Sequence, residues 1–278
     1  MLSLFINPSA GKGKPMAVAA MAEKILTQRH IPFAVYAAEW PESLEHCTEA
    51  WIIGGDGTLN FFINRYADIQ IPLVMLKAGT GNDFAWALYG NRTNQEIVEW
   101  VLHQHAHPVD MGLCNGRRFL NAVGLGFDGE VLRSMQTIRK LGGHLGYLWI
   151  VFKQIFRYRE MEYELECNGR LETGKYLLLH AANARRTGGG FMISPASELR
   201  DASLNLVRCQ ALPVWKRLRY LPVIEKGLHL DLPFISHNLV NKVFIRAHKP
   251  VYAQVDGELI YSRDFDIQLK AGALMLRY

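Results

Sequence analysis

One arrangement recurs through the first hundred residues: an apolar strand ends in small residues, and a helical stretch follows. Residues 2–6, 33–36, 51–53 and 71–76 are the strand candidates. Residues 16–28, 59–66 and 93–104 are the helix candidates, and residues 16–28 have helical spacing with one apolar face. Strands that alternate with helices in this way are typical of a parallel sheet with helices packed on its faces. The pattern therefore predicts an α/β domain with a parallel sheet and glycine-rich loops.

The pattern changes after about residue 110, where turn residues come closer together and strand-like runs dominate. Those runs are residues 163–167, 176–181, 204–208, 243–245 and 274–276. They predict a mainly antiparallel β-sandwich, interrupted by helices near residues 145–156 and 214–227. We therefore divide the chain into an α/β domain over residues 1–112 and a β-rich domain over residues 113–278.

Charge and cysteine usage narrow the class of protein. The 278 residues carry a formal net charge of +5, which favours an anionic partner such as a nucleotide, a nucleic acid or an acidic lipid surface. The four cysteines are far apart and include no C-x-x-C pair, which argues against a zinc site or a disulfide framework and fits a reducing cytoplasm. The longest apolar run is far shorter than the ~20 residues that span a bilayer, so we expect any membrane contact to be peripheral.

The strongest local motif is the sequence IIGGDGTLN at residues 52–60. Its glycines let the backbone approach a ligand closely, and the N-terminus of the following helix presents free N–H groups, which together suit a phosphate. Asp56 could hold a cation that grips the phosphates. The structural alternative is a tight turn between strand and helix in which Asp56 only caps a helix.

Two further glycine-containing loops follow neighbouring strands. The sequence KAGTGNDFA at residues 77–85 places glycine, threonine and glycine before Asn82 and Asp83, and NPSAGKGK at residues 7–14 follows the first strand. Loops at the carboxyl ends of neighbouring parallel strands face one crevice, so we expect all three to converge on a nucleotide triphosphate. None of them is a Walker A loop, because no G-x-x-x-x-G-K-[ST] sequence occurs.

A fourth glycine motif, GLGFDG at residues 124–129, spells G-x-G-x-x-G after an apolar strand. Dinucleotide-binding folds with that spacing carry an acidic residue about 20 positions further on. Residues 131–159 contain no Asp or Glu, so we interpret GLGFDG as a structural turn, with Asp128 facing a cleft between the domains.

Taken in order, the motifs resemble those of the bacterial diacylglycerol kinase and sphingosine kinase family. That family carries N-P-x-[SA]-G, G-G-D-G-T-[LIV]-N and G-T-x-N-D-[FL]-A, and then F-x-N-x-x-G-x-G-F-D, G-G-G-x-x-x-x-P-x-A and D-G-E. Five occur here in that order, the last two of these at residues 119–128 and 256–258. The sequence GGGFMISPA at residues 188–196 resembles the remaining motif, although its alanine follows the proline directly. The resemblance therefore covers essentially the whole chain.

The resemblance implies a lipid kinase that uses ATP and Mg²⁺ to phosphorylate a hydroxyl of diacylglycerol or a related lipid, which the β-rich domain would hold. Asp56 and Asp83 match acidic residues near the magnesium and phosphates, and Asp256 or Glu258 matches the general base that takes the proton of the lipid hydroxyl. The residues that match ATP-contacting segments are Asn7, Pro8, Ser9, Ala10, Gly11, Gly54, Gly55, Asp56, Gly57, Thr58, Leu59, Asn60, Gly79, Thr80 and Asn82.

Two of these assignments leave alternatives open. The D-G-E sequence at residues 256–258 also suits a plain hairpin turn between two strands. The family binds a structural magnesium after the P-x-A turn, and of its acidic pair only Asp201 is present here. The resemblance therefore implies a second metal at Asp201, completed by backbone oxygens of Glu198 and Ser203.

Residues 131–159 are rich in Lys and Arg and contain an aromatic, apolar stripe at residues 145–156 with helical spacing. A basic amphipathic helix of this kind is typical of an element that lies on an anionic membrane surface. A second basic cluster follows at residues 216–219. The structural alternative is a helix packed on the core with a solvated basic rim.

Three functions are compared. An ATP-dependent lipid kinase at the inner face of the membrane accounts for the five matching motifs and for the similar segment at residues 188–196. A soluble NAD kinase-like enzyme shares the G-G-D-G-T loop but lacks the N-E pair expected downstream, and a non-catalytic lipid- or nucleotide-binding regulator has no need for the base. We expect a lipid substrate and no nucleic acid partner, since no nucleic-acid module accompanies the charge; a homodimer is compatible with the sequence.

Overall fold

The structure, a computed structural model, describes residues 1–37, 39–66, 68–137 and 144–278. The chain divides into two compact units: unit 1 contains residues 1–110 and 272–278, and unit 2 contains residues 111–271. The division predicted from the sequence did not anticipate that the last seven residues return to unit 1. Arg139 and Lys140 of the predicted basic stretch lie outside the described residues.

Unit 1 is built on a parallel sheet, as predicted. Its strands β1 (Leu2–Ile6), β2 (Phe33–Tyr36), β3 (Glu49–Gly54) and β4 (Leu73–Lys77) are parallel in the order β2-β1-β3-β4, and the end of β13 (Glu258–Arg277) joins β4 in parallel. β3 and β4 are almost entirely buried, which explains their nearly continuous apolar sequences.

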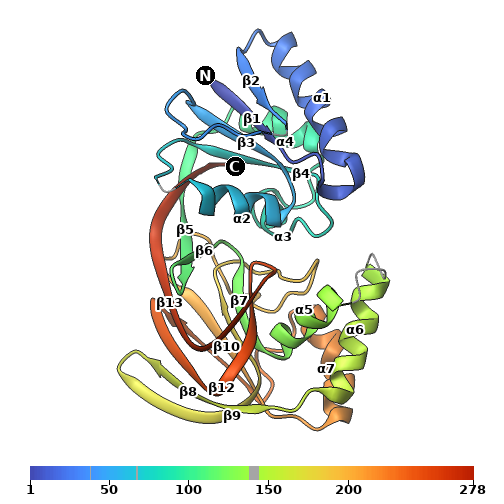
Figure 1. Cartoon of the computed structure of the whole chain (residues 1–278), viewed down its shortest axis with the longest axis vertical. Coiled ribbons are helices and arrows are strands. Elements are labelled where there is room, and N and C mark those ends of the chain that lie inside the picture. Colours follow the sequence, from blue (N-terminus) through green and yellow to red (C-terminus); the bar gives the residue numbers. More distant parts are fainter. Residues whose placement is uncertain (38, 67, 138–143) are drawn as a thin grey trace. The chain divides into compact units, whose positions relative to one another are not determined.

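The helices of unit 1 begin where the sequence supplies caps or small residues (Figure 1). They are the short 3₁₀ helix η1 (Ala10–Gly13), α1 (Lys14–Gln28), α2 (Asp56–Arg65), α3 (Asp83–Tyr89) and α4 (Asn94–Val101). Thr93 and Glu96 form a complete capping box at the start of α4, and α2 begins directly after Gly55. Phe62 of α2 packs edge-on against Phe5 of β1 at 5.0 Å between ring centroids, which seats α2 on the sheet.

Unit 2 is the antiparallel, sandwich-like domain that the sequence predicted. Its strands are the end of β5 (Ala106–Cys114), β6 (Arg117–Phe119), β7 (Ala122–Gly126), β8 (Met161–Cys167), β9 (Arg170–Ala182), β10 (Leu204–Gln210), β11 (Ile235–Val240), β12 (Lys242–Val255) and most of β13. They pair antiparallel in the order β11-β10-β9-β7-β12-β13, while β8 also pairs with β9 and β12. The alternating buried residues of these strands form one apolar core.

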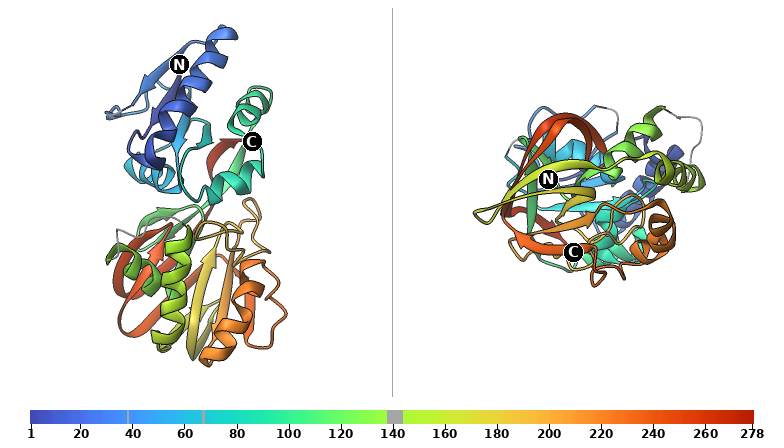
Figure 2. Two further views of the ribbon diagram at one scale, coloured as in Figure 1. Left: turned by 90° about the vertical axis from the view of Figure 1, so that its right-hand side faces the viewer. Right: turned by 90° about the horizontal axis from the view of Figure 1, so that it is seen from below.

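Three helices of unit 2 lie together beside its strands: α5 (Phe127–Thr137), α6 (His144–Arg157) and α7 (Val214–Glu225) (Figures 1 and 2). The sequence predicted α6 and α7. It missed α5, because the GLGFDG motif that we interpreted as a plain turn is the junction where β7 ends at Gly126, with φ of +81°, and α5 begins. In the described part of the chain, no helix combines the length and the apolar character needed to cross a bilayer.

Candidate active site

Three loops of unit 1 meet at the carboxyl ends of β1, β3 and β4. The backbone N–H of Asn7 donates to the carbonyl of Ile53 at 3.2 Å, and that of Ala78 donates to the carbonyl of Gly54 at 2.8 Å. The sheet register therefore continues into the first residue of each loop. This confirms the convergence that the alternation of strands and loops predicted.

Glycines allow two of these loops to touch through their backbones. A Cβ atom on Gly79 would lie 2.4 Å from the Cα atom of Gly55, and one on Gly55 would lie 2.8 Å from the Cα atom of Gly79. Gly11 has a φ of +52°, and a Cβ there would lie 1.9 Å from the carbonyl oxygen of Ala78. Any side chain at these positions would force the loops apart, so the cluster depends on glycine. Gly57, in the exposed first turn of α2, faces open space.

Polar side chains fix the loops without occupying the space in front of them. The amide of Asn7 donates to the Thr58 hydroxyl at 3.1 Å, and its Oδ1 accepts the N–H of Ser9 at 3.1 Å. Asn82, at a φ of +53°, binds both the N–H and the carbonyl of Gly79. These side chains shape the loops. At the start of α2, the N–H groups of Thr58 and Leu59 donate to the carbonyl of Gly55 at 2.9 and 3.2 Å.

Asp56 connects the second loop to the third. Its two carboxylate oxygens accept the backbone N–H groups of Asp83 and Phe84 at 3.0 and 2.9 Å, so Asp56 caps α3 from another helix. Although the residue is only partly buried, burial of its carboxyl raises its pKa, against the lowering effect of the N–H groups of Phe84 and Asp83. The cap predicted as the structural alternative is thus present, but on α3.

The remaining predicted residues of unit 1 divide by exposure. Pro8, Ser9 and Thr80 are exposed at the loop tips. The side chains of Leu59 and Asn60 are almost completely buried. Their contact with a nucleotide stays a prediction.

The D-G-E sequence forms the tight hairpin between β12 and β13. Asp256 and Gly257 have φ of +49° and +81°, and Val255 pairs with Glu258, which is the geometry of a two-residue type I′ turn. The Asp256 carboxylate accepts the N–H groups of Leu120, Asn121 and Ala122 at 2.7 to 3.0 Å. It anchors the F-x-N segment to this turn.

Glu258 has different surroundings from Asp256. Its side chain is 52% exposed, and its nearest cation in an ion pair is Arg117 at 3.9 Å. Since a general base needs a carboxylate oxygen within reach of the substrate proton, Glu258 suits that role better than Asp256.

The implied second metal site combines the Asp201 carboxylate with backbone oxygens of Glu198 and Ser203. The Oδ1 of Asp201 accepts the N–H of Ser203 at 3.0 Å, and Glu198 lies 3.8 Å from the guanidinium of Arg185. Within the described residues, no three His, Cys, Asp or Glu side chains gather as a metal-binding group. A metal at Asp201, Glu198 and Ser203 stays a prediction.

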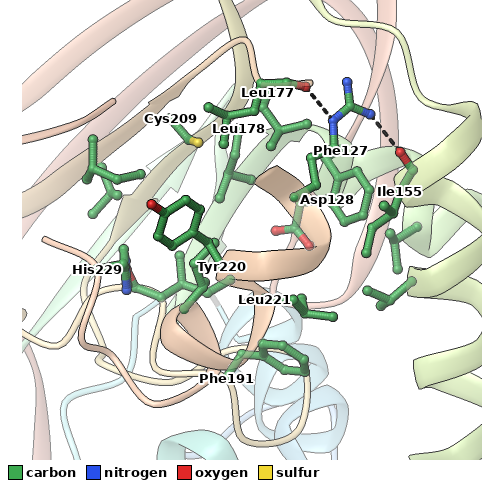
Figure 3. Close-up of a pocket in the computed structure, with 18 residues that line it drawn as sticks. Phe127, Asp128, Ile155, Leu177, Leu178, Phe191, Cys209, Tyr220, Leu221 and His229 are labelled. Atoms are coloured by element: carbon green, nitrogen blue, oxygen red, sulfur yellow. Dashed lines mark hydrogen bonds between the residues drawn. The ribbon is translucent and has the colours of Figure 1, made fainter. Parts of the chain in front are cut away.

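Unit 2 contains an apolar pocket of about 840 Å³, its opening included, between α5, α6, α7 and the strands β9 to β11 (Figure 3). Its walls include Phe127, Ile155, Leu177, Phe191 and Leu221. The apolar side chains that line this pocket are chemically compatible with a hydrocarbon chain. The sequence analysis missed it, because its residues come from distant segments and each resembles an ordinary core residue.

A small polar group adjoins this pocket. The Asp128 carboxylate accepts a hydrogen bond from Gln254 Nε2 at 3.0 Å and lies 3.5 Å from the ring of buried His180. The Oε1 of the same Gln254 accepts the N–H of Gly257 at 2.9 Å. Asp128 therefore lines the pocket and is linked through Gln254 to the D-G-E turn.

Comparison with known families agrees with both units. The family model "Diacylglycerol kinase catalytic domain" matches residues 1–114, and "YegS C-terminal NAD kinase beta sandwich-like domain" matches residues 121–277. The chain belongs to the diacylglycerol kinase and YegS-like lipid kinase family. Its relatives include a "Probable lipid kinase YegS-like" of Pseudomonas fluorescens, 30% identical over 80% of this chain and 74% of the relative. A diacylglycerol kinase of Bacillus subtilis is 28% identical over 74% of this chain and 69% of the relative.

Solved structures show that the fold is shared more widely than the family. A crystal structure of a diacylglycerol kinase from Bacillus anthracis superimposes with a TM-score of 0.76 at 20% identity, covering 100% of this chain and 96% of that chain. An NAD kinase from Archaeoglobus fulgidus in complex with ATP gives a TM-score of 0.59 at 11% identity, covering 100% and 94% of the two chains. The NAD kinase fold is therefore the more distant of the two.

Proposed function

We propose that this family member is an ATP-dependent lipid kinase that phosphorylates a hydroxyl of diacylglycerol or a related lipid. The observation that carries the proposal is the pair of sites: a glycine-built loop cluster in unit 1, and an apolar pocket linked to the D-G-E turn in unit 2. A soluble acceptor such as NAD has no use for the second site.

In the reaction, the γ-phosphoryl group moves from ATP to the lipid oxygen, the hydroxyl proton passes to a carboxylate, and ADP leaves. The loops at residues 7–11, 54–58 and 79–82 hold the phosphates through backbone N–H groups. Glu258 accepts the proton, and Asp256 holds the turn in place. Mg²⁺ bound with the nucleotide would neutralise charge on the phosphates, and Asp56 and Asp83 are the side chains that would lie near it.

The pocket positions the acceptor. An acyl chain enters among Phe127, Leu177 and Leu221, and the polar end of the lipid lies toward Asp128 and the turn that carries Glu258. Burial lowers the pKa of His229 in the pocket wall, which keeps that side chain neutral and compatible with a hydrocarbon chain. Phosphorylation of the lipid would take place at the inner face of the membrane, where ATP and lipid are both present.

Phosphate transfer from radiolabelled ATP to a panel of lipids in mixed micelles, with NAD as a soluble acceptor, tests the proposal. We expect labelled diacylglycerol or a related lipid and no labelled NAD. Glu258→Gln should lower kcat by about a hundredfold or more while the melting temperature stays unchanged. Asp256→Asn should instead lower the melting temperature, because it leaves one of three backbone N–H groups without an acceptor.

Glu162→Gln, a substitution of an exposed carboxylate on β8, is the matched control and should keep full activity. Labelled NAD without labelled lipid would favour the NAD kinase-like alternative. Absence of transfer to every acceptor, with ATP or lipid still bound, would favour a non-catalytic regulator. Full activity of Glu258→Gln would refute the assignment of the base even if lipid is phosphorylated.

A further inference from the structure

The solvent side of α6 carries a row of large aromatic side chains. Trp149, Phe152 and Phe156 are 56%, 44% and 52% exposed. They also touch one another, with ring centroids 6.1 Å apart between Trp149 and Phe152 and 5.1 Å apart between Phe152 and Phe156. We call these three residues the aromatic ridge. Adjacent exposed rings of this size mark an interaction surface more often than an ordinary solvated face.

Cations accompany the aromatic ridge. Lys153 and Arg157 are exposed on the same helix, and Arg159 is exposed just beyond its end. Residues 144–159 contain no acidic residue. The next carboxylate along the chain, Glu160, is paired at 2.5 Å with the buried guanidinium of Arg217 and does not offset these charges at the surface.

The opposite side of α6 faces the apolar pocket. Ile150, Val151 and Ile155 are buried, and the last two line the pocket (Figure 3). The sequence-based stripe had grouped Ile155 with the aromatic residues; the structure places it on the buried side. One helix thus forms a pocket wall with one face and exposes aromatic rings and cations on the other.

The neighbouring helix α7 repeats this division. Leu221 and Ile224 line the pocket, whereas Trp215 and Leu218 are 61% and 36% exposed. Both helices are seen from outside in the left view of Figure 2. The wall of the proposed lipid pocket is therefore built from helices that carry apolar residues on two sides. An ordinary surface helix needs apolar residues only on the side that faces the core.

We propose that the aromatic ridge and its cations dock onto an anionic lipid bilayer, with the rings entering the headgroup region. Helices that lie in the membrane interface typically combine Trp and Phe on one face with Lys and Arg beside them. This proposal rests on the proposed function, because the purpose of docking is to bring the lipid acceptor to the pocket. A second copy of this chain is a poorer occupant, because a two-fold interface would bring Lys153 and Arg157 of both copies together.

Sedimentation of the full chain with vesicles tests the docking surface. The vesicles are phosphatidylcholine alone or phosphatidylcholine mixed with phosphatidylglycerol. The wild-type chain should bind the mixed vesicles. Phe152→Ser combined with Phe156→Ser should lower the partition coefficient about tenfold or more, and Lys153→Gln combined with Arg157→Gln should lower it roughly fivefold per cation on the anionic vesicles alone. Leu171→Ser, a change at a 73% exposed apolar side chain on β9, is the control and should bind as the wild type does.

Activity on a short-chain, water-dispersed diacylglycerol separates failure of docking from failure of the proposed function. All of these variants should phosphorylate it at the wild-type rate, because none of them alters the pocket or the loops. If the wild type phosphorylates that substrate but binds no vesicle, the docking proposal fails and the kinase stands. If vesicles bind and no lipid is phosphorylated, the kinase proposal fails instead. A ridge variant that turns a dimer into a monomer and still binds vesicles would assign the surface to a second copy and overturn the proposal.

Discussion

Asp56 lies in the first turn of α2, but its carboxylate accepts the backbone N–H groups at the start of α3. A carboxylate at the N-terminus of a helix is favourable for that helix, since it meets both the free N–H groups and the positive end of the dipole. The same contact costs desolvation, because the carboxyl is buried. Asp56 is therefore a positioning residue that holds the β3–α2 loop and the start of α3 in register.

The raised pKa of Asp56 predicts a specific pH dependence of stability. Burial is the larger effect, so the folded chain keeps this proton to a higher pH than the unfolded chain, whose carboxyl titrates near 3.8. The contribution of Asp56 to stability is then greatest below about pH 3.8 and declines as pH rises through the folded pKa. Asp56→Asn has no proton to lose at this position.

Urea unfolding of the wild type and of Asp56→Asn, from about pH 3 to about pH 7, measures this dependence. We expect the difference in unfolding free energy, wild type minus variant, to fall across that range. Glu162→Gln, which changes an exposed carboxylate far along the chain, serves as the control. A difference that grows with pH would mean that the backbone hydrogen bonds outweigh burial and that the pKa is lowered.

At the scale of the element, the contact between Gly55 and Gly79 decides whether the β3–α2 and β4–α3 loops stay together. Gly79→Ala places a methyl group 2.4 Å from the Cα atom of Gly55, and neither backbone can yield without moving its loop. We expect a loss of about 1–3 kcal/mol in unfolding free energy and a raised KM for ATP.

Gly57→Ala is the matched comparison for stability, because its methyl group would meet nothing within 4 Å and lies in helix α2. Alanine is the better helix former by about 1 kcal/mol, so this variant should be as stable as the wild type or more so. Urea denaturation of both variants gives the test. Equal destabilisation of the two would show that a loss of glycine flexibility, and not the contact between the loops, is the cause.

The elements that were predicted best are those whose structure is determined by residues close together in the sequence. β1 and β2 have the predicted bounds, since an apolar run bounded by turn residues has few alternative arrangements. The convergence of the three loops also followed from the alternation of strands and helices along the chain, because it predicts neighbouring parallel strands. Asp56 as the cap of α3, the link from Gln254 to Asp128, and the pocket depend on residues tens of positions apart, which no local pattern encodes.

α5 shows why one local pattern was misjudged. The sequence G-x-G-x-x-G suggested a nucleotide loop, and once that was dismissed only a turn was left. In the structure, Gly124 is close-packed against the Asp128 carboxylate, and a Cβ on Gly129 would lie 2.0 Å from the carbonyl oxygen of Tyr252. These glycines let α5 lie close to β7 and β12, so glycine is needed at these positions for packing between elements.

At the scale of the whole molecule, the chain does not divide at a single point. β5 leaves unit 1 for unit 2, and β13 returns, so that residues 272–278 complete the sheet of unit 1 beside β4. Leu274 and Leu276 are buried there, and the guanidinium of Arg277 donates to the Glu49 carboxylate at 2.7 Å. Unit 1 therefore depends on residues that are synthesised after all of unit 2.

Removal of residues 272–278 should accordingly destabilise unit 1 and spare unit 2. Two leucines that are fully buried are worth about 1.5–3 kcal/mol each, before the loss of the bond from Tyr89 Oη to the Arg277 carbonyl is counted. Hydrogen exchange should accelerate in β3 and β4 and remain unchanged in β9 and β10, since local stability follows the contacts of each unit. Arg277→Ala, which removes the ion pair and keeps the leucines, should give a smaller acceleration in the same strands. Equal acceleration in both units would show that they unfold as one body and that the last seven residues stabilise the whole chain.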